Sequence, residues 1–230
     1  MTATQQIGRT VGFLLFLIMA IGIPSIFLRG LSRAMTTSPD FLNDIVQNAL
    51  NTRIAVFLDI LASALWIVIA IKLFPLLNQY KNSFALWFLG IWLIQVATIV
   101  FSNVSHLSLL SSGQVFIELD DIDTAHFLSL AILKIEEYFA AHFIGLILFA
   151  AAAFSLYYFF FKTRLIPRWL SVWGMVAITL VFIASWLNIF DITVSFHFYS
   201  QNGVFMITLT GWLIAKGFYT DPQKKTISST

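Results

Sequence analysis

A run without any Asp, Glu, Lys or Arg extends from Tyr138 to Phe161, between Glu137 on one side and Lys162 on the other. The hydrocarbon core of a bilayer is about 30 Å thick and needs roughly 20 apolar residues of α-helix, because each residue adds about 1.5 Å. Water is not present there to hydrogen-bond a broken backbone, so a spanning segment of this kind has to be helical. The run is therefore predicted to be a transmembrane helix.

The composition extends this prediction to the whole chain. Of the 230 residues, 59% are hydrophobic and only 10% are charged, whereas charged residues make up about a quarter of a typical soluble domain. The net charge of +2 is too small to suggest nucleic acid as a partner, and the basic residues lie at the ends of apolar runs. We expect membrane lipids as the surroundings and no nucleic-acid partner. Because the chain contains no Cys, disulfides and thiolate metal ligands are excluded.

Six apolar segments predict an all-α fold, a single-domain bundle of six transmembrane helices. The predicted spans are residues 11–28, 54–77, 84–104, 138–161, 169–189 and 196–218, and residues 219–230 are predicted to form a cytoplasmic tail. The sixth span has the weakest pattern, because its uninterrupted apolar part extends only from Val204 to Ala215. This helix has to begin among polar residues or be tilted and shielded by its neighbours.

Two connections on the same side of the predicted bundle are long. Residues 30–53 are predicted to form an exposed loop with a short helix, because Thr36 to Asp40 offer a turn and a helix start. Residues 105–137 are acidic and are predicted to contain an extra amphipathic helix between the third and fourth spans. That helix would either lie in the membrane interface or continue into the fourth span as one protruding rod.

The distribution of Lys and Arg predicts the orientation in the membrane, because these residues accumulate on the cytoplasmic side. With the N-terminus inside, the outer side holds only Arg29, Arg33, Arg53 and Lys134. The cytoplasmic side then holds Arg9, Lys72, Lys81, Lys162, Arg164, Arg168, Lys216, Lys224 and Lys225. Both termini are therefore predicted to be cytoplasmic.

Two ionisable residues lie about one turn inside predicted spans. These are Asp59 and His142, and ionisable residues within a membrane suggest a functional site by default. Because their two spans run in the same direction, we expect both side chains at a similar depth, lining one pocket that opens to the outer face. An ion pair would let each keep its charge. The alternative is that Asp59 pairs with Arg53 or with a donor on a neighbouring helix and only fastens the bundle.

The predicted ligand-binding residues are five of the ionisable side chains that lie in the outer half or the outer loops: Asp59, His142, Glu137, His126 and His106. A zinc hydrolase would need three His or carboxylate ligands around a water. The His residues are scattered without HxxxH, HExxH or HxH spacing, and His126 and Glu137 would lie about 16 Å apart along one helix. We therefore predict no metal and no cofactor, and the chain contains no GxSxG or phosphate-loop motif.

Several stretches also match a known family in order and spacing. They are RTVGFLLFLI near the start, TRIAVFLDIL leading to LFPLLNQYKNSFAL, IGLILF followed by FKTRLIPRWLSVWG, and GWLIAKG near the end. Together they resemble the bacterial membrane proteins catalogued as domain of unknown function 4386. The resemblance implies six or so transmembrane helices in a multi-pass protein of the bacterial cell membrane, and it brings no established activity. It also implies an Arg in the third span and a His in the fourth, where this chain has Trp92 and Ala152.

The sequence thus favours a non-enzymatic protein that binds a lipid, a small apolar ligand or a membrane-protein partner in an outward-facing cavity. Two alternatives stay open. One is a small-solute or ion transporter, motivated by Asp59 and His142 inside the membrane. The other is a metal-dependent membrane hydrolase.

Overall fold

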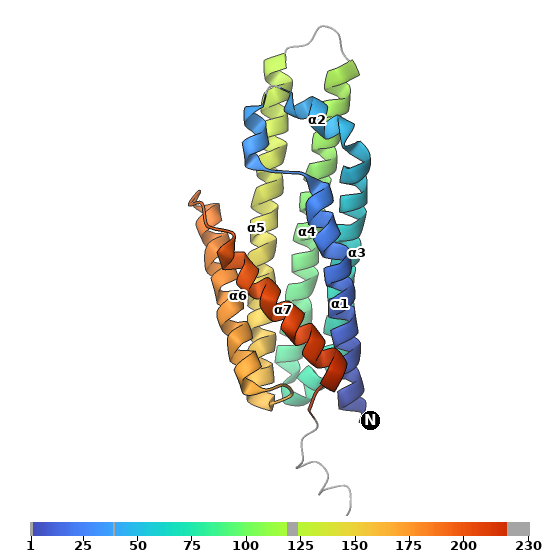
Figure 1. Cartoon of the computed structure of the whole chain (residues 1–230), viewed down its shortest axis with the longest axis vertical. Coiled ribbons are helices and arrows are strands. Elements are labelled where there is room, and N and C mark those ends of the chain that lie inside the picture. Colours follow the sequence, from blue (N-terminus) through green and yellow to red (C-terminus); the bar gives the residue numbers. More distant parts are fainter. Residues whose placement is uncertain (1, 39, 119–123, 220–230) are drawn as a thin grey trace, which may run out of the picture.

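The computed structural model describes residues 2–38, 40–118 and 124–219, and all the regular structure in this part is helical (Figure 1). The predicted tail therefore lies almost wholly outside the described residues. The elements are α1 (Ala3–Arg29), the 3-10 helix η1 (Arg33–Thr37), α2 (Phe41–Gln47), α3 (Ala49–Tyr80), α4 (Asn82–Glu118), α5 (Thr124–Thr163), α6 (Arg168–Ile189) and α7 (His197–Lys216).

The six long helices form a closed ring. Each packs against the next in the order α1, α3, α4, α5, α6 and α7, and α7 packs back against α1. The start of α1, the turns from α3 to α4 and from α5 to α6, and the end of α7 meet at one end, which we call the lower end (Figure 1). From the opposite, upper end of α6, α7 crosses diagonally to the lower end of α1. The ring is therefore closed tightly below and less tightly above.

Two glycines of α1 allow the close crossing of α1 and α7. A Cβ atom added to Gly12 would lie 2.7 Å from the Cβ of Leu213 and 2.8 Å from the backbone nitrogen of Ile214, and Gly8 is equally crowded by residues just beyond α7. At the same place Gln5 donates a hydrogen bond to the carbonyl of Lys216 (3.2 Å), and Arg9 donates to that of Ala215 (3.1 Å). Side chains of α1 thus satisfy carbonyls in the last turn of α7, which have no partner within their own helix.

Within the described residues, five helices are long and apolar enough to cross a membrane: α1, α3, α4, α5 and α6. The prediction of a multi-pass helical membrane protein is confirmed at this level. The predicted sixth span corresponds to α7, which is not among the five. The reason is that its first turns carry the polar residues His197, Gln201 and Asn202.

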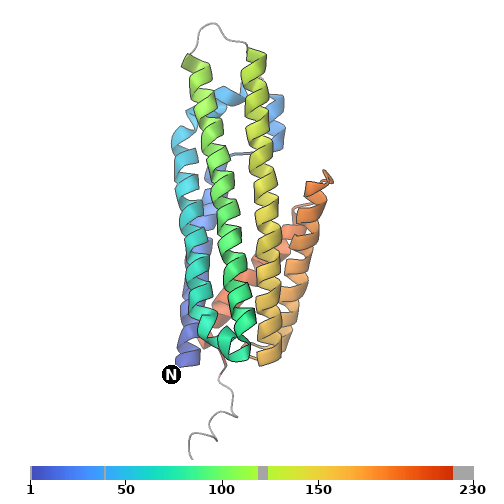
Figure 2. The same cartoon turned by 180° about the vertical axis from the view of Figure 1, so that it is seen from behind.

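Between the third and fourth spans, the described residues do not form the helix lying in the membrane interface that was one of the two predicted alternatives. α4 has 37 residues and α5 has 40, about 55 and 60 Å of helix, roughly twice the thickness of a bilayer core. No separate amphipathic helix lies between them in the described part, where residues 105–118 continue α4 and residues 124–137 belong to α5. Both helices therefore rise above α6 as a two-helix extension, which Figure 2 shows side by side. Residues 119–123 lie outside the described residues.

A small second core explains why the extension stays helical. Phe41, Leu42 and Ile45 of α2 pack with Leu109 and Leu110 of α4 and with Ala131 and Ile135 of α5. A helix lying flat in the membrane interface would lose this burial. The short helix predicted within residues 30–53 is confirmed as α2, but its apolar face is buried rather than exposed, and α3 already begins at Ala49.

Ion pairs of η1 mark the level at which the extension begins. Arg33 lies 2.9 Å from a carboxylate oxygen of Glu136 and 3.7 Å from one of Asp191, which follows the end of α6. Glu136 of α5 is therefore level with the upper end of α6. The 22 residues of α6 span about 33 Å, close to the thickness of a bilayer core.

We expect Gly12→Leu to destabilise the protein by about 1–3 kcal/mol, because the new side chain would force α7 away from α1. The matched control is Gly90→Leu, since a Cβ at Gly90 of α4 meets nothing within 4 Å. Thermal unfolding followed by differential scanning fluorimetry in detergent micelles measures both. Equal melting temperatures for the two variants would contradict the close α1–α7 crossing.

Candidate functional site

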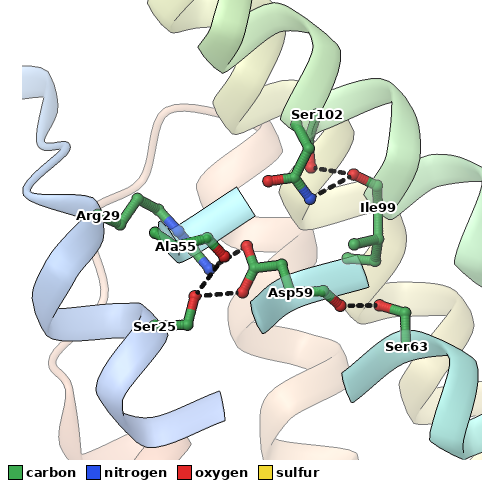
Figure 3. Close-up of polar contacts among 8 residues, drawn as sticks. Ser25, Arg29, Ala55, Asp59, Ser63, Ile99 and Ser102 are labelled. Carbon is green, nitrogen blue, oxygen red and sulfur yellow. Dashed lines mark hydrogen bonds and ion pairs between the residues drawn. The ribbon is translucent and has the colours of Figure 1, made fainter. Parts of the chain in front are cut away.

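A buried ion pair joins α1 to α3 in the upper half of the bundle (Figure 3). A guanidinium nitrogen of Arg29 lies 2.6 Å from Asp59 Oδ2, and each side chain is only 14% exposed. The hydroxyl of Ser25, which is fully buried, lies 2.5 Å from the other carboxylate oxygen and donates to it. Charge-assisted hydrogen bonds of this kind are about twice as strong as neutral ones. Two donors of α1 therefore hold both oxygens of one α3 carboxylate.

Local structure places these groups opposite one another. Ser25 and Arg29 are one helical turn apart on α1, and the helix ends directly after Arg29 because Gly30 adopts a left-handed conformation (φ 61°). A cation in the last turn of a helix is favourable for the helix dipole. On α3, the hydroxyl of Ser63 donates to the carbonyl of Asp59 (2.7 Å), one turn earlier.

A cavity of about 310 Å³ adjoins the ion pair, between α1, α3, α4 and α5. Its polar lining consists of Arg29, Asp59, Ser63, Gln95, Ser102, Tyr138 and His142. Apolar residues complete the wall, among them Met19, Ile23, Trp66 and Leu146. Arg29, Asp59, Ser102 and Tyr138 lie toward the upper end of the cavity. Gln95 comes two turns below Ser102 on α4 and lies toward its lower end, among apolar residues such as Leu146.

One aromatic residue of the cavity lining, Trp66, belongs to a cluster of three rings. Trp66 of α3 stacks on Trp92 of α4 at 4.5 Å between ring centroids with an interplanar angle of 8°. Phe149 of α5 meets both indoles edge-on, at 5.4 and 5.7 Å. We call these residues the aromatic floor. Trp66 thus joins the cavity wall to the packed core, to which Trp92 belongs.

The structure brings Asp59 and His142 to the same cavity, but it does not pair them. Asp59 binds Arg29 instead, and the ring of His142 stacks on Tyr138 at 5.9 Å. Of the alternatives left by the sequence, the donor on a neighbouring helix is the one found. The physical reason is that a guanidinium is permanently charged and presents several donors in a planar fork, which suits a carboxylate better than imidazole does.

The other predicted residues lie elsewhere. His106 is 1% exposed and packs its ring against Tyr138 (5.6 Å), outside the cavity lining. Glu137 pairs with Lys134 (2.8 Å), accepts from Ser105 (3.3 Å), and borders a separate groove on the outer face of α4 and α5. His126 belongs to the first turn of α5, outside the part of the chain whose side chains are described. Whether any of the predicted residues binds a ligand stays a prediction.

Sequence reasoning missed Arg29 and Gln95 as site residues. Arg29 was interpreted only as the charge that ends the first span, although it lies near the outer boundary at which Asp59 was placed. Gln95 is 6% exposed in the middle of the apolar α4. For Gln95 the available signal was a polar side chain within an otherwise apolar span. For Arg29 it was a charge at the same outer boundary as Asp59.

No three His, Asp or Glu side chains lie close enough together to hold a metal ion among the described residues. The metal-dependent hydrolase therefore gains no support from this part of the chain.

A comparison with protein families decides the relationship of the chain. Residues 10–217 match the model described as "Domain of unknown function (DUF4386)". The chain belongs to this family. The DUF4386 match begins within α1 and ends after α7, so it includes every helix that lines the cavity. Neither a curated protein nor a solved structure matches the chain.

We expect Asp59→Asn to lower the free energy of unfolding by about 3–5 kcal/mol, because it leaves the Arg29 guanidinium charged and unpaired in a buried site. The double variant Arg29→Met/Asp59→Leu should recover most of this loss, since no buried charge is left over. Chemical denaturation in micelles measures both.

The matched control is Glu137→Gln, which breaks the ion pair with Lys134. The Glu137 side chain is 42% exposed and that of Lys134 is 34% exposed. Exposed pairs contribute about 0–1 kcal/mol. A loss for Asp59→Asn no larger than the control, or a double variant as unstable as the single one, would show that burial does not matter to the Arg29–Asp59 pair.

Proposed function

We propose that this DUF4386 protein is a non-enzymatic membrane protein that binds a ligand with both polar and apolar groups in the cavity beside Arg29 and Asp59. The observation that carries the proposal is that the buried ion pair borders an open volume. A pair that only fastened two helices would be enclosed by packed side chains. This volume, about 310 Å³, lies within the range of roughly 300–1,000 Å³ that is usual for small-molecule sites.

Unsatisfied polar atoms support the proposal. Gln95 Oε1 and Arg29 Nε are buried and have no hydrogen-bond partner among the described protein atoms, and both residues line the cavity. Leaving such a group unpaired costs about 1–3 kcal/mol. Both atoms are closed to solvent in this structure, so a ligand offsets these costs only when the Gln95 and Arg29 side chains turn toward the cavity.

We place the cavity in the outer half of a bacterial cell membrane, with both termini in the cytoplasm. The concentration of Lys and Arg at the lower end supports this orientation. α7 then serves as the sixth span, since its last turn meets the start of α1 at the lower end. Its polar first turns set it apart from the other five helices, and His197 and Gln201 there are exposed at the upper end, where a span would meet the membrane surface.

Single-cysteine labelling tests the orientation, because the chain has no native Cys. We expect an impermeant maleimide to modify Ser111→Cys, in the extension of α4, in intact cells. Ser83→Cys, at the start of α4, should react only after the membrane is permeabilised. Both serines are exposed. The reverse pattern would show that the termini are outside.

The ligand-binding proposal is tested by filling the cavity. Ala62 of α3 lines it, whereas Ala64 of the same helix is exposed on the outside of the bundle. We expect Ala62→Phe to lower the amount of small lipid retained from a bacterial polar lipid extract about tenfold, because overpacking costs about 1–3 kcal/mol. Native mass spectrometry of the purified protein measures retention. The control Ala64→Phe should behave as wild type, and equal retention by all three proteins would refute the proposal.

The aromatic floor argues for binding over transport. A solute that entered from the upper end would meet Trp66, Trp92 and Phe149, which pack against one another across α3, α4 and α5. Trp92 is fully buried there. A membrane-protein partner remains the less supported form of binding, because the polar groups face a cavity rather than the outer surface.

A further inference from the structure

We infer that the ligand is a single-chain amphiphile with an uncharged, hydrogen-bonding head group, whose head lies in the cavity and whose chain follows a groove between α1 and α7. This inference rests on the proposed function and names the ligand class. It comes from three observations: the groove adjoins the cavity, the groove is apolar, and the charges in the cavity cancel.

The groove and the cavity are neighbours on α1. The groove, about 570 Å³, is lined by α1 between Phe16 and Pro24 and by α7 between Ile207 and Ile214. Met19 and Ile23 line both the groove and the cavity. A ligand can therefore occupy both spaces by passing over these two side chains.

The tilt of α7 creates the groove. The two helices touch at Gly12, but α7 moves away from α1 toward the upper end (Figure 1). At Gly211, which lines the groove, a Cβ atom would meet nothing within 4 Å. The side chains beside this opening are large, apolar and about half exposed, including Phe16 at 50% and Ile23 at 51%. Such a surface suits a hydrocarbon chain.

The dimensions favour one chain and a compact head. From Phe16 to Arg29 the distance along α1 is about 20 Å, somewhat more than half a bilayer core. The groove runs between two helices only, α1 and α7, which suits one hydrocarbon chain. The cavity volume is near the lower limit for small-molecule sites, so it fits a small head group rather than a large one.

The charges in the cavity favour an uncharged head. Arg29 and Asp59 neutralise each other, and no other Lys, Arg, Asp or Glu belongs to the cavity lining of the described chain. An anionic head would lie beside Asp59 and a cationic head beside Arg29, and neither would find a free countercharge to offset its desolvation. A head group with hydroxyls, by contrast, has no charge to desolvate, and it meets the polar side chains of the cavity lining.

The test compares three probes with the same chain: 1-monomyristoylglycerol, myristic acid and tetradecyltrimethylammonium. Their affinities are measured by competition on the whole protein in phosphatidylcholine nanodiscs, because alkyl glycoside detergents share the proposed chemistry. We expect the uncharged glyceride to bind at least tenfold more tightly than either charged probe. Shortening its chain should weaken binding by about fourfold for each methylene removed from the groove.

Two glycines of α7 provide a matched pair for the groove. Gly211 lines it and Gly203 does not, and both are exposed with nothing within 4 Å of an added Cβ. Gly211→Phe should abolish the dependence on chain length, whereas Gly203→Phe should keep it. If the glyceride binds both variants as it binds wild type, the chain does not occupy the groove and the inference is wrong.

The outcomes separate this inference from the proposed function. If a charged probe binds more tightly and Ala62→Phe weakens it, the head-group class is wrong and the cavity remains a ligand site. If binding of every probe is unaffected by Ala62→Phe, neither the ligand class nor the cavity as its site survives. Size-exclusion profiles identical to wild type confirm that each variant is folded.

Discussion

The contact between Arg29 and Asp59 is the interaction on which the upper half of this protein depends. Two buried charges stabilise each other only as a pair. Removing one of them leaves the other buried and unpaired, which costs far more than replacing both by apolar residues. The contact joins the last turn of α1 to α3. The chain then turns through η1 and α2, which cover the extension of α4 and α5. The cavity lies directly beside the pair, so the same contact supports both the fold and the candidate site.

The prediction from sequence succeeded where a pattern is local and failed where a partner is distant in the chain. Apolar runs identify α1, α3, α4, α5 and α6, because the bilayer requires a minimum length of apolar helix. The depth of Asp59 and His142 follows from helical rise, and both line one cavity. Asp59 pairs with Arg29 and not with His142 because of the way α1 packs against α3. The spacing of residues in the sequence does not reveal that packing. The continuation of α4 above the level of α6 depends likewise on burial against α2, which is far away from α4 in the sequence.

The family match names a domain of unknown function, so the chemistry of this chain has to be argued from its own residues. At the two positions where the resemblance implies an Arg and a His, the structure has Trp92 and Ala152, both fully buried. Trp92 stacks on Trp66 as part of the aromatic floor, and Ala152 belongs to the lower core. Apolar packing occupies the space that those polar groups would need. The polar side chains that line the cavity, among them Arg29, Asp59 and Gln95, lie nearer the upper end than Trp92 and Ala152.

The ring of helices is closed by two contacts of different physical character. At the lower end, α7 lies against the glycines of α1 with little space between the backbones, a contact that is close-packed and insensitive to salt. At the upper end, Arg33 reaches Glu136 and Asp191 through side chains that are 38%, 50% and 88% exposed, so dissolved ions screen these attractions. Breaking the Arg33 contacts therefore costs less than separating α7 from α1. The glycine crossing of α1 and α7 is thus the fixed point of the ring, and the exposed Arg33 contacts are the ones that open most easily when salt is added.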